Sequence, residues 1–224
     1  MEVWWLSEGG LAVLTDFDDT AITLNIPQMI LSKHVYADWR GLDRLFEANR
    51  ISFEDCLRSQ YSLITLTEEQ ILEEVKGSIQ FREGFDTLVE ACGIRNVPLT
   101  IVSGGFDFVI RSVLLERGWV GRVGMTGTHI HFAPSGMIVD FPRPRSPAYH
   151  NFKDDLVSWN QRMGRKVIYV GDGLSDYEAV RLADAGCVIA NSMLARLCKE
   201  NSVDVIEVAD FNEVVRAVEG WSLP

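Results

Sequence analysis

The sequence predicts an α/β protein: a Rossmann-like, doubly wound parallel sheet that carries an inserted helical cap. Three short apolar segments, Leu11 to Leu14, Pro98 to Val102 and Lys166 to Val170, are each followed by Asp, Ser or Gly within two residues. Buried parallel strands have this form, and their carboxyl ends border one ligand crevice. Helical spacing of apolar residues between these segments supplies the crossovers that such a sheet needs.

After the first strand, the stretch from Asn25 to Arg82 interrupts the alternation of strands and helices. It has long amphipathic segments, and Thr67-Glu68-Glu69-Gln70 is a helix-start signal. A helical insert placed directly after the first strand can fold over the crevice. We therefore expect a core of residues 1–24 and 83–224 and a helical cap of residues 25–82.

The remaining segments complete the predicted core. Phe85 to Cys92, Phe108 to Leu115 and Tyr177 to Ala185 have apolar residues at helical spacing, and Asp176 is a candidate N-cap of the last of these helices. The segment from Thr126 to Pro147 alternates around Pro134-Ser135-Gly136 as a hairpin does and then becomes proline-rich. We expect a surface excursion there.

Composition and charge narrow the classes of function. The chain has 224 residues, of which 47% are hydrophobic and 24% charged, as in an ordinary globular domain. Its formal net charge of -11 argues against a nucleic-acid binder, which captures phosphate backbones with clustered Lys and Arg. No apolar run is long enough to span a bilayer, and the four cysteines form no C-x-x-C pair. We expect a cytoplasmic monomer or homodimer that binds neither nucleic acid nor membrane.

Two carboxylates stand two residues apart just beyond the first strand, in Asp16-Phe17-Asp18-Asp19-Thr20. One ionised carboxylate of such a pair can attack phosphorus while the other, protonated, gives its proton to the leaving alkoxide. Neighbouring carboxylates repel a phosphate dianion, so this chemistry needs a divalent cation to neutralise them. Alone the motif is weak, because a strand that ends in Asp and Thr more often begins a turn or caps a helix.

Three further signals occur along the chain. Ser103-Gly104-Gly105 joins a hydroxyl to backbone that can approach phosphate oxygens closely, although in isolation a plain glycine-rich turn explains it about as well. The segment Gly171 to Asp176 offers two more carboxylates, Asp172 and Asp176, which either suit Mg²⁺ or belong to an ordinary Asp-Gly turn. Lys153 lies in a helical segment, where it either neutralises phosphate or is a solvated surface residue. Because three of the four motifs fall at predicted strand ends that face one crevice, coincidence is a poor explanation.

These four motifs resemble those of the haloacid dehalogenase (HAD) superfamily, and the resemblance spans nearly the whole predicted core. It implies the HAD fold and hydrolysis of a phosphomonoester through an aspartyl-phosphate intermediate, with Mg²⁺ as cofactor and a small phosphorylated metabolite as substrate. In this resemblance Asp16 is the nucleophile, and Asp18 is the general acid that later activates water as a base. An acid two residues after the nucleophile is similar to the phosphatase branch, since the dehalogenase branch lacks it.

The resemblance also implies ligands for the metal and for phosphate. Asp172 would bind Mg²⁺ together with the Asp16 carboxylate and the Asp18 backbone carbonyl. The residues implied to hold the phosphoryl oxygens are Ser103, the Gly104 amide and Lys153, and those implied to support the site are Thr20, Gly173 and Asp176.

Within the superfamily, the insert and the string Ser103 to Asp107 resemble the phosphoserine-phosphatase group. Those enzymes hold the substrate ammonium with a Glu nine residues beyond the nucleophile, where this chain has Asn25. Their cap Arg for the substrate carboxylate falls at Gln60, and Arg58 stands two residues before it as a partial substitute. Without both anchors phosphoserine is disfavoured, and Asn25, Arg58 and Gln60 become candidate cap contacts to another substrate.

Three segments, Phe81 to Phe85, Ile101 to Phe108 and Leu194 to Asn201, resemble the methionine-salvage phosphatases that act on 2-hydroxy-3-keto-5-methylthiopentenyl-1-phosphate. A cysteine-rich segment that precedes the motif lysine in some of those enzymes is absent here. The alternatives are a phosphoserine phosphatase, a phosphotransferase, a phosphoacceptor signalling domain, or a relative that only binds phosphorylated ligands. A signalling domain would lack both the acid two residues after the acceptor and a large cap.

Overall fold

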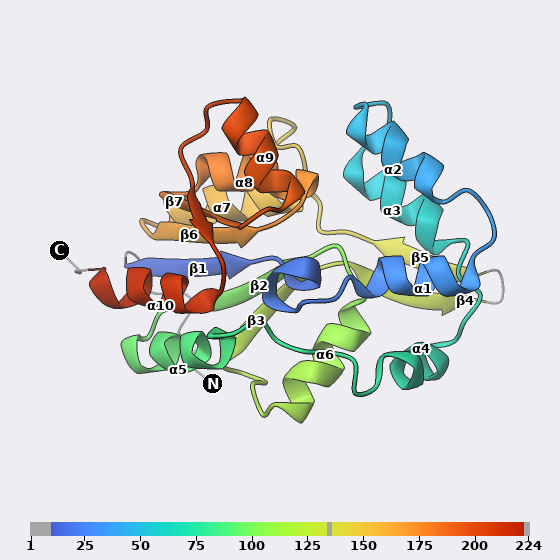
Figure 1. The fold of residues 1–224 in the computed structure, drawn as a ribbon, viewed down its shortest axis with the longest axis horizontal. Coiled ribbons are helices and arrows are strands. Elements are labelled where there is room, and N and C mark those ends of the chain that lie inside the picture. Colours follow the sequence, from blue (N-terminus) through green and yellow to red (C-terminus); the bar gives the residue numbers. More distant parts are fainter. Residues whose placement is uncertain (1–9, 134–135, 222–224) are drawn as a thin grey trace.

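A six-stranded, all-parallel sheet forms the centre of the molecule. The structure is a computed structural model that describes residues 10–133 and 136–221, so residues 1–9 of the predicted core lie outside it. The strand order is β3-β2-β1-β6-β7-β8, and the predicted doubly wound sheet is confirmed (Figure 1). Its strands are β1 (Leu11–Thr15), β2 (Leu99–Ser103), β3 (Val123–Gly127), β6 (Lys166–Gly171), β7 (Ala185–Ile189) and β8 (Ile206–Val208).

The strand order reverses at β1, which lies between β2 and β6. Val13 of β1 is in register with Leu99 on one side and with Ile168 on the other. A crevice forms where the connections leave such a switch point in opposite directions. The carboxyl ends of β1, β2 and β6 therefore open into the same space, which positions the site.

Helices cover both faces of the sheet (Figure 1). On one face lie α5 (Phe85–Arg95), α6 (Asp107–Glu116) and α10 (Phe211–Gly220), and on the other lie α7 (Phe152–Arg162), α8 (Tyr177–Leu182) and α9 (Met193–Glu200). Successive strand residues point to opposite faces, so buried Val13 joins the first layer and buried Leu14 the second. Asp176 stands at the N-cap position of α8 but makes no capping bond with its side chain, which has other partners described below.

Four helices fill the predicted cap segment: α1 (Ile26–His34), α2 (Arg40–Glu47), α3 (Phe53–Tyr61) and α4 (Glu68–Val75). Their starts follow from local chemistry, since Asn25 and Ser52 each accept a backbone N–H as N-caps. Thr67 and Gln70 form the reciprocal capping box that the sequence indicated for α4. These helices lie beyond the carboxyl ends of β1 and β2 (Figure 1).

The predicted hairpin is present as an antiparallel pair, β4 (His129–Ala133) and β5 (Gly136–Asp140). It is more than a surface excursion, because Ile130, Met137 and Val139 are buried in the main core. Its strand β5 packs against α3, so the hairpin supports the helices over the crevice (Figure 1). The alternation of the sequence indicated this pairing, but not what the apolar face would pack against.

All four cysteines, Cys56, Cys92, Cys187 and Cys198, are buried free thiols, in agreement with the absence of a paired motif. Among residues 10–133 and 136–221, no helix combines the length and apolarity needed to cross a membrane.

Candidate active site

The chain turns sharply after β1 and brings Asp16 and Asp18 to the crevice. The turn runs through a short helical segment, η2 (Phe17–Ala21), in which Asp19 has a positive φ of 56°. Asp tolerates this left-handed conformation better than most residues do. Asp16 is buried, with 8% of the residue exposed, and its carboxylate accepts a hydrogen bond from the Phe17 backbone N–H at 2.8 Å.

Arg82 holds this turn from outside. Its guanidinium donates to the backbone carbonyls of Thr20 at 3.0 Å and of Asp19 at 2.6 Å. These bonds satisfy buried carbonyl groups in a segment that has no regular hydrogen-bond ladder. Arg82 thus positions the turn. Its isolated charge predicted no such role, although it lies in Phe81 to Phe85, one of the segments that carry the family resemblance.

Asp18 lies between the start of α1 and the loop after β2. Its Oδ1 accepts from the Ile26 backbone N–H at 2.9 Å, and burial raises the pKa of its carboxyl to about 8. A carboxyl that stays protonated near neutral pH is suited to donate a proton. A Cβ on Gly105 would stand 2.2 Å from Asp18 Oδ2, so this close approach requires glycine.

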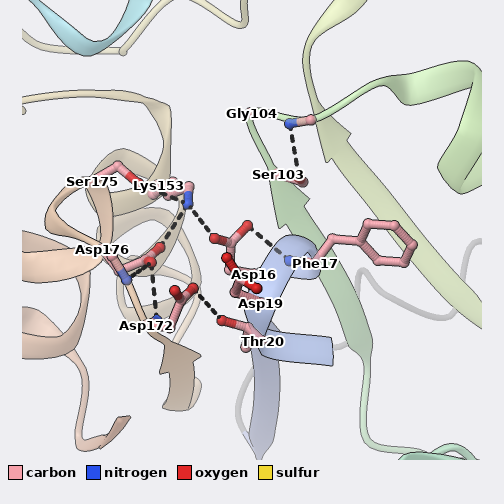
Figure 2. Close-up of polar contacts among 12 residues, drawn as sticks. Asp16, Phe17, Asp19, Thr20, Ser103, Gly104, Lys153, Asp172, Ser175 and Asp176 are labelled. Carbon is pink, nitrogen blue, oxygen red and sulfur yellow. Dashed lines mark hydrogen bonds and ion pairs between the residues drawn. The ribbon is translucent and has the colours of Figure 1, made fainter. Parts of the chain in front are cut away.

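Lys153 joins two of the motif carboxylates (Figure 2). Its ammonium lies 2.7 Å from Asp176 Oδ1 and 3.1 Å from Asp16 Oδ2, and it donates to Ser175 Oγ at 3.1 Å. Burial acts to lower the pKa of Lys153, but the two carboxylates raise it above the ordinary value, so the lysine keeps its charge. The side chain is 1% exposed, which excludes the alternative of a solvated surface residue.

Asp176 is fully engaged by protein groups. Its Oδ1 accepts from Tyr169 Oη at 2.7 Å as well as from Lys153, and its Oδ2 accepts from the backbone N–H groups of Asp172 at 3.3 Å and Gly173 at 3.1 Å. Asp176 thus shapes the loop after β6. Asp172 is held differently: within residues 10–133 and 136–221 a single side chain donates to its carboxylate, Thr20 Oγ1 to Oδ1 at 2.7 Å.

The donor set fits a hard divalent cation. Carboxylate oxygens of Asp16, Asp172 and Asp176 all lie within 4.8 Å of one another. Burial and the repulsion between these groups raise the pKa of Asp16 to about 7 and of Asp172 to about 8. Asp176 already accepts four hydrogen bonds from protein groups, so Asp16 and Asp172 are the two carboxylates of this cluster that could hold a divalent cation.

The loop after β2 supplies polar groups opposite Lys153. Ser103 Oγ accepts a hydrogen bond from the Gly105 backbone N–H at 2.9 Å. Figure 2 labels Ser103 and Gly104 of this loop. A Cβ on Gly104 would lie 2.7 Å from both Leu57 and Phe53 of α3. Glycine is therefore required at position 104, because the helix rests directly on this backbone.

A cavity of about 320 Å³ joins these groups to the cap helices. Its floor holds the motif residues, and its roof combines apolar side chains, including Leu31, Phe46, Phe53 and Leu57, with the carboxylates of Asp43 and Glu47. Lys153 is the one lysine or arginine that lines it in the described part of the chain.

The three candidate cap contacts differ in placement. Asn25 lines the cavity, but its amide bonds Asp19 Oδ2 at 3.0 Å and caps α1. Gln60 also lines it, yet it is 4% exposed and donates to Asp43 Oδ1 at 2.7 Å. Arg58 is not among the lining residues; its guanidinium lies 5.0 Å from the centroid of the Phe141 ring.

Known proteins that are similar to this chain include several named phosphatases. No family model matches the chain. A 2-hydroxy-3-keto-5-methylthiopentenyl-1-phosphate phosphatase of Lysinibacillus sphaericus is 23% identical over 92% of this chain and 93% of its own length. A bifunctional enzyme MtnB/MtnX of Bacillus licheniformis is 25% identical over 92% of this chain, which spans 49% of that enzyme. The chain thus matches about half of the bifunctional relative.

Solved structures share the fold. The phospho-aspartyl intermediate analogue of phosphoserine phosphatase superposes with a TM-score of 0.70 at 19% identity, covering 94% of this chain and 99% of the other. A HAD family hydrolase of Salmonella enterica gives 0.72 at 16% identity, covering 95% of this chain and 72% of the other. The chain is thus similar in sequence to named phosphatases and in fold to phosphoserine phosphatase and to a HAD family hydrolase, in agreement with the resemblance of its four motifs.

Proposed function

We propose that the chain is a Mg²⁺-dependent phosphomonoester hydrolase that passes through an aspartyl-phosphate on Asp16. The observation that carries this proposal is the buried contact of Lys153 with both Asp16 and Asp176, opposite the loop of Ser103. A fixed cation beside a buried carboxylate, with polar groups facing it, is the environment that phosphoryl transfer requires. Asp172 and Asp16, with the Asp18 backbone carbonyl, would hold the metal, which neutralises charge on the phosphoryl oxygens.

In the first step, a carboxylate oxygen of Asp16 forms a bond to phosphorus as the bond from phosphorus to the leaving oxygen breaks. Lys153, Ser103 Oγ and the Gly104 amide bind the equatorial oxygens. Asp18, whose pKa is raised to about 8, gives its proton to the departing alkoxide. The raised pKa supports this role because it keeps the proton on Asp18 near neutral pH.

In the second step, Asp18 is a carboxylate and acts as a base. It takes a proton from water, whose oxygen bonds to phosphorus and displaces the Asp16 carboxylate, so that phosphate leaves and the nucleophile is regenerated. The helices over the cavity would exclude bulk water during the first step.

For the leaving group, we propose a small metabolite without a carboxylate, such as 2-hydroxy-3-keto-5-methylthiopentenyl-1-phosphate. The named relatives act on that compound, and the apolar side chains of Leu31, Phe46 and Leu57 suit a methylthio tail. Phosphoserine is the second candidate, because structural neighbours are phosphoserine phosphatases. Among the described residues that form the roof, however, no lysine or arginine faces the carboxylate that phosphoserine would bring, and the charged side chains there are Asp43 and Glu47.

A substrate panel tests these proposals. With Mg²⁺ we expect turnover of p-nitrophenyl phosphate, its loss with EDTA, and a higher kcat/KM for the methionine-salvage compound than for phosphoserine. Acid quenching during turnover should trap an acyl phosphate on wild-type protein and none on Asp16→Asn. Absence of turnover on the whole panel would favour a phosphoacceptor or phospho-ligand-binding protein, and transfer of phosphate to added alcohols would indicate a phosphotransferase. Cytoplasmic location and a monomeric or homodimeric state stay predictions.

A further inference from the structure

The last residue of α3, Tyr61, reaches the loop that follows β2. Its ring is 1% exposed, and its Oη donates a hydrogen bond to the backbone carbonyl of Gly104 at 2.7 Å. The same peptide unit carries the Gly105 N–H, which donates to Ser103 Oγ at 2.9 Å. The peptide plane between residues 104 and 105 is therefore held at both ends, by a cap tyrosine on the oxygen and by the serine on the nitrogen.

Apart from Ser103 Oγ, which accepts the Gly105 N–H, the two glycines of the loop offer no side chain that restricts this plane. Gly104 and Gly105 have no Cβ, so rotation of the peptide between them meets little local resistance. Contacts from outside take that role: Leu57 and Phe53 would meet a Cβ on Gly104 at 2.7 Å, and the Tyr61 ring packs 4.9 Å from the Phe106 ring. Among these contacts, the Tyr61 hydroxyl is the directional one that fixes where the carbonyl points.

The orientation of this peptide decides what the Ser103 hydroxyl can do. While Ser103 Oγ accepts the Gly105 N–H, its own hydrogen is free to be donated into the cavity. Burial raises the pKa of Tyr61 well above its ordinary value, so the phenol remains a donor. Hydrogen bonds in such a row polarise one another, from the phenol through the peptide to the serine.

We propose that Tyr61 is a positioning residue that, through the Gly104–Gly105 peptide, keeps the Ser103 hydroxyl aimed at a phosphoryl oxygen. This inference rests on the proposed function and extends it. The loop Ser103-Gly104-Gly105 would have its phosphate-binding geometry only while α3 packs against it. Binding of phosphate and placement of the cap helix would thereby be coupled through one hydroxyl.

The test is a double-mutant cycle with Tyr61→Phe and Ser103→Ala, which reports whether the two groups act together. We expect Tyr61→Phe to lower kcat/KM for p-nitrophenyl phosphate about tenfold when Ser103 is present, and less than about twofold in the Ser103→Ala protein. Affinity for inorganic phosphate with Mg²⁺, measured by calorimetry, should follow the same pattern. A general loosening of the cap would instead give equal losses in both backgrounds.

Equal losses, or no loss in either background, would overturn the inference. Tyr149→Phe is the matched control, since it also removes a hydrogen-bonded phenol hydroxyl, 2.6 Å from Ser158 Oγ, and leaves the cavity untouched. Its kcat/KM should equal that of wild type. Failure of the proposed function gives a different result, namely wild-type protein without phosphatase activity, whereas failure of this inference alone leaves the wild type active.

Discussion

The two halves of the cavity are built by different means. The floor comes from the segments that follow β1, β2 and β6 and from the first turn of α7, and its groups contact one another: Lys153 contacts Asp16 and Asp176, and Thr20 donates to Asp172. The roof comes from α1, α2 and α3 and presents mainly apolar surface with two carboxylates. Its polar side chains are largely used within the cap, as when Gln60 bonds Asp43.

From this difference we infer that the floor carries out the reaction and that the roof selects the substrate. A network of buried charges fixes distances and tolerates little change, so the floor suits bond making and breaking. An apolar roof discriminates by shape, and each methylene there contributes modestly. Substitutions in the floor should therefore have large effects on turnover, and substitutions in the roof smaller ones.

The largest effect is expected for Asp16→Asn. An amide of the same size cannot form the aspartyl-phosphate, so turnover of p-nitrophenyl phosphate should fall by a factor of about 10³ or more. Steady-state kinetics with Mg²⁺ measure it. Activity within tenfold of wild type would show that hydrolysis does not require Asp16 as nucleophile.

Next comes Lys153→Met, which leaves two buried carboxylates without their cation. Breaking a buried ion pair by removing one partner costs about 3–5 kcal/mol, and we expect that loss of stability together with a fall in kcat of about a hundredfold. Urea unfolding measures the loss of stability, and steady-state kinetics measure the fall in kcat. Lys166→Met is the control: its side chain is 62% exposed and pairs with Asp184, so less than about 1 kcal/mol should be lost. Similar losses for both lysines would contradict the picture of a buried charge network.

Removal of Mg²⁺ should lower the stability of the folded protein by an amount that depends on pH. The pKa values of Asp16, Asp18 and Asp172 are raised in the folded protein from an ordinary value of 3.8 to between about 7 and about 8, so the folded state binds protons that the unfolded state has lost. The free energy of unfolding in EDTA should fall as pH rises from about 4 to about 8. Mg²⁺ needs ionised ligands, so the gain in Tm that it brings should grow over the same range.

Thermal unfolding at pH 5 and pH 8, with EDTA or Mg²⁺, measures this dependence. The variant Asp172→Asn should show a smaller Mg²⁺-dependent gain at pH 8 than wild type. A gain that is the same at both pH values would argue against a metal held by these carboxylates.

A smaller effect is expected in the roof for Phe53→Ala. The Phe53 ring lies over Gly104 and 5.6 Å from the Lys153 ammonium, so truncation opens a path for water and removes a cation–π contact. We expect kcat to fall about tenfold for p-nitrophenyl phosphate, with a larger change in the ratio of kcat/KM values between apolar and polar substrates. An unchanged ratio would show that selectivity lies elsewhere.

The smallest effect is expected for Arg58→Ala, which tests a candidate contact from the sequence. Arg58 pairs with the exposed Asp55 and stacks on Phe141 outside the cavity. Kinetic constants for phosphoserine and for p-nitrophenyl phosphate should change less than about twofold. A selective loss of phosphoserine turnover would place Arg58 in contact with substrate and blur the distinction between roof and floor.

Much of the floor could be predicted from the sequence because three of its four motifs follow strand ends, and Lys153 in α7 is the exception. Apolar runs that end in Asp16, Ser103 and Asp172 predict a parallel sheet, and parallel strands bring their carboxyl ends together. The hairpin at β4 and β5 was also correctly predicted, but its burial under α3 was not. Alternation of side chains reveals which face is apolar and leaves open what covers it.

Local periodicity and residue type are enough to predict the sheet, the helical insert and the side chains capable of the chemistry. The partners of those side chains follow only from the folded arrangement: Arg82 bonds the turn after Asp16, Gln60 bonds Asp43 within the cap, and Tyr61 bonds Gly104. These contacts join residues 17 to 63 positions apart, and they depend on how the folded helices pack rather than on spacing along the chain.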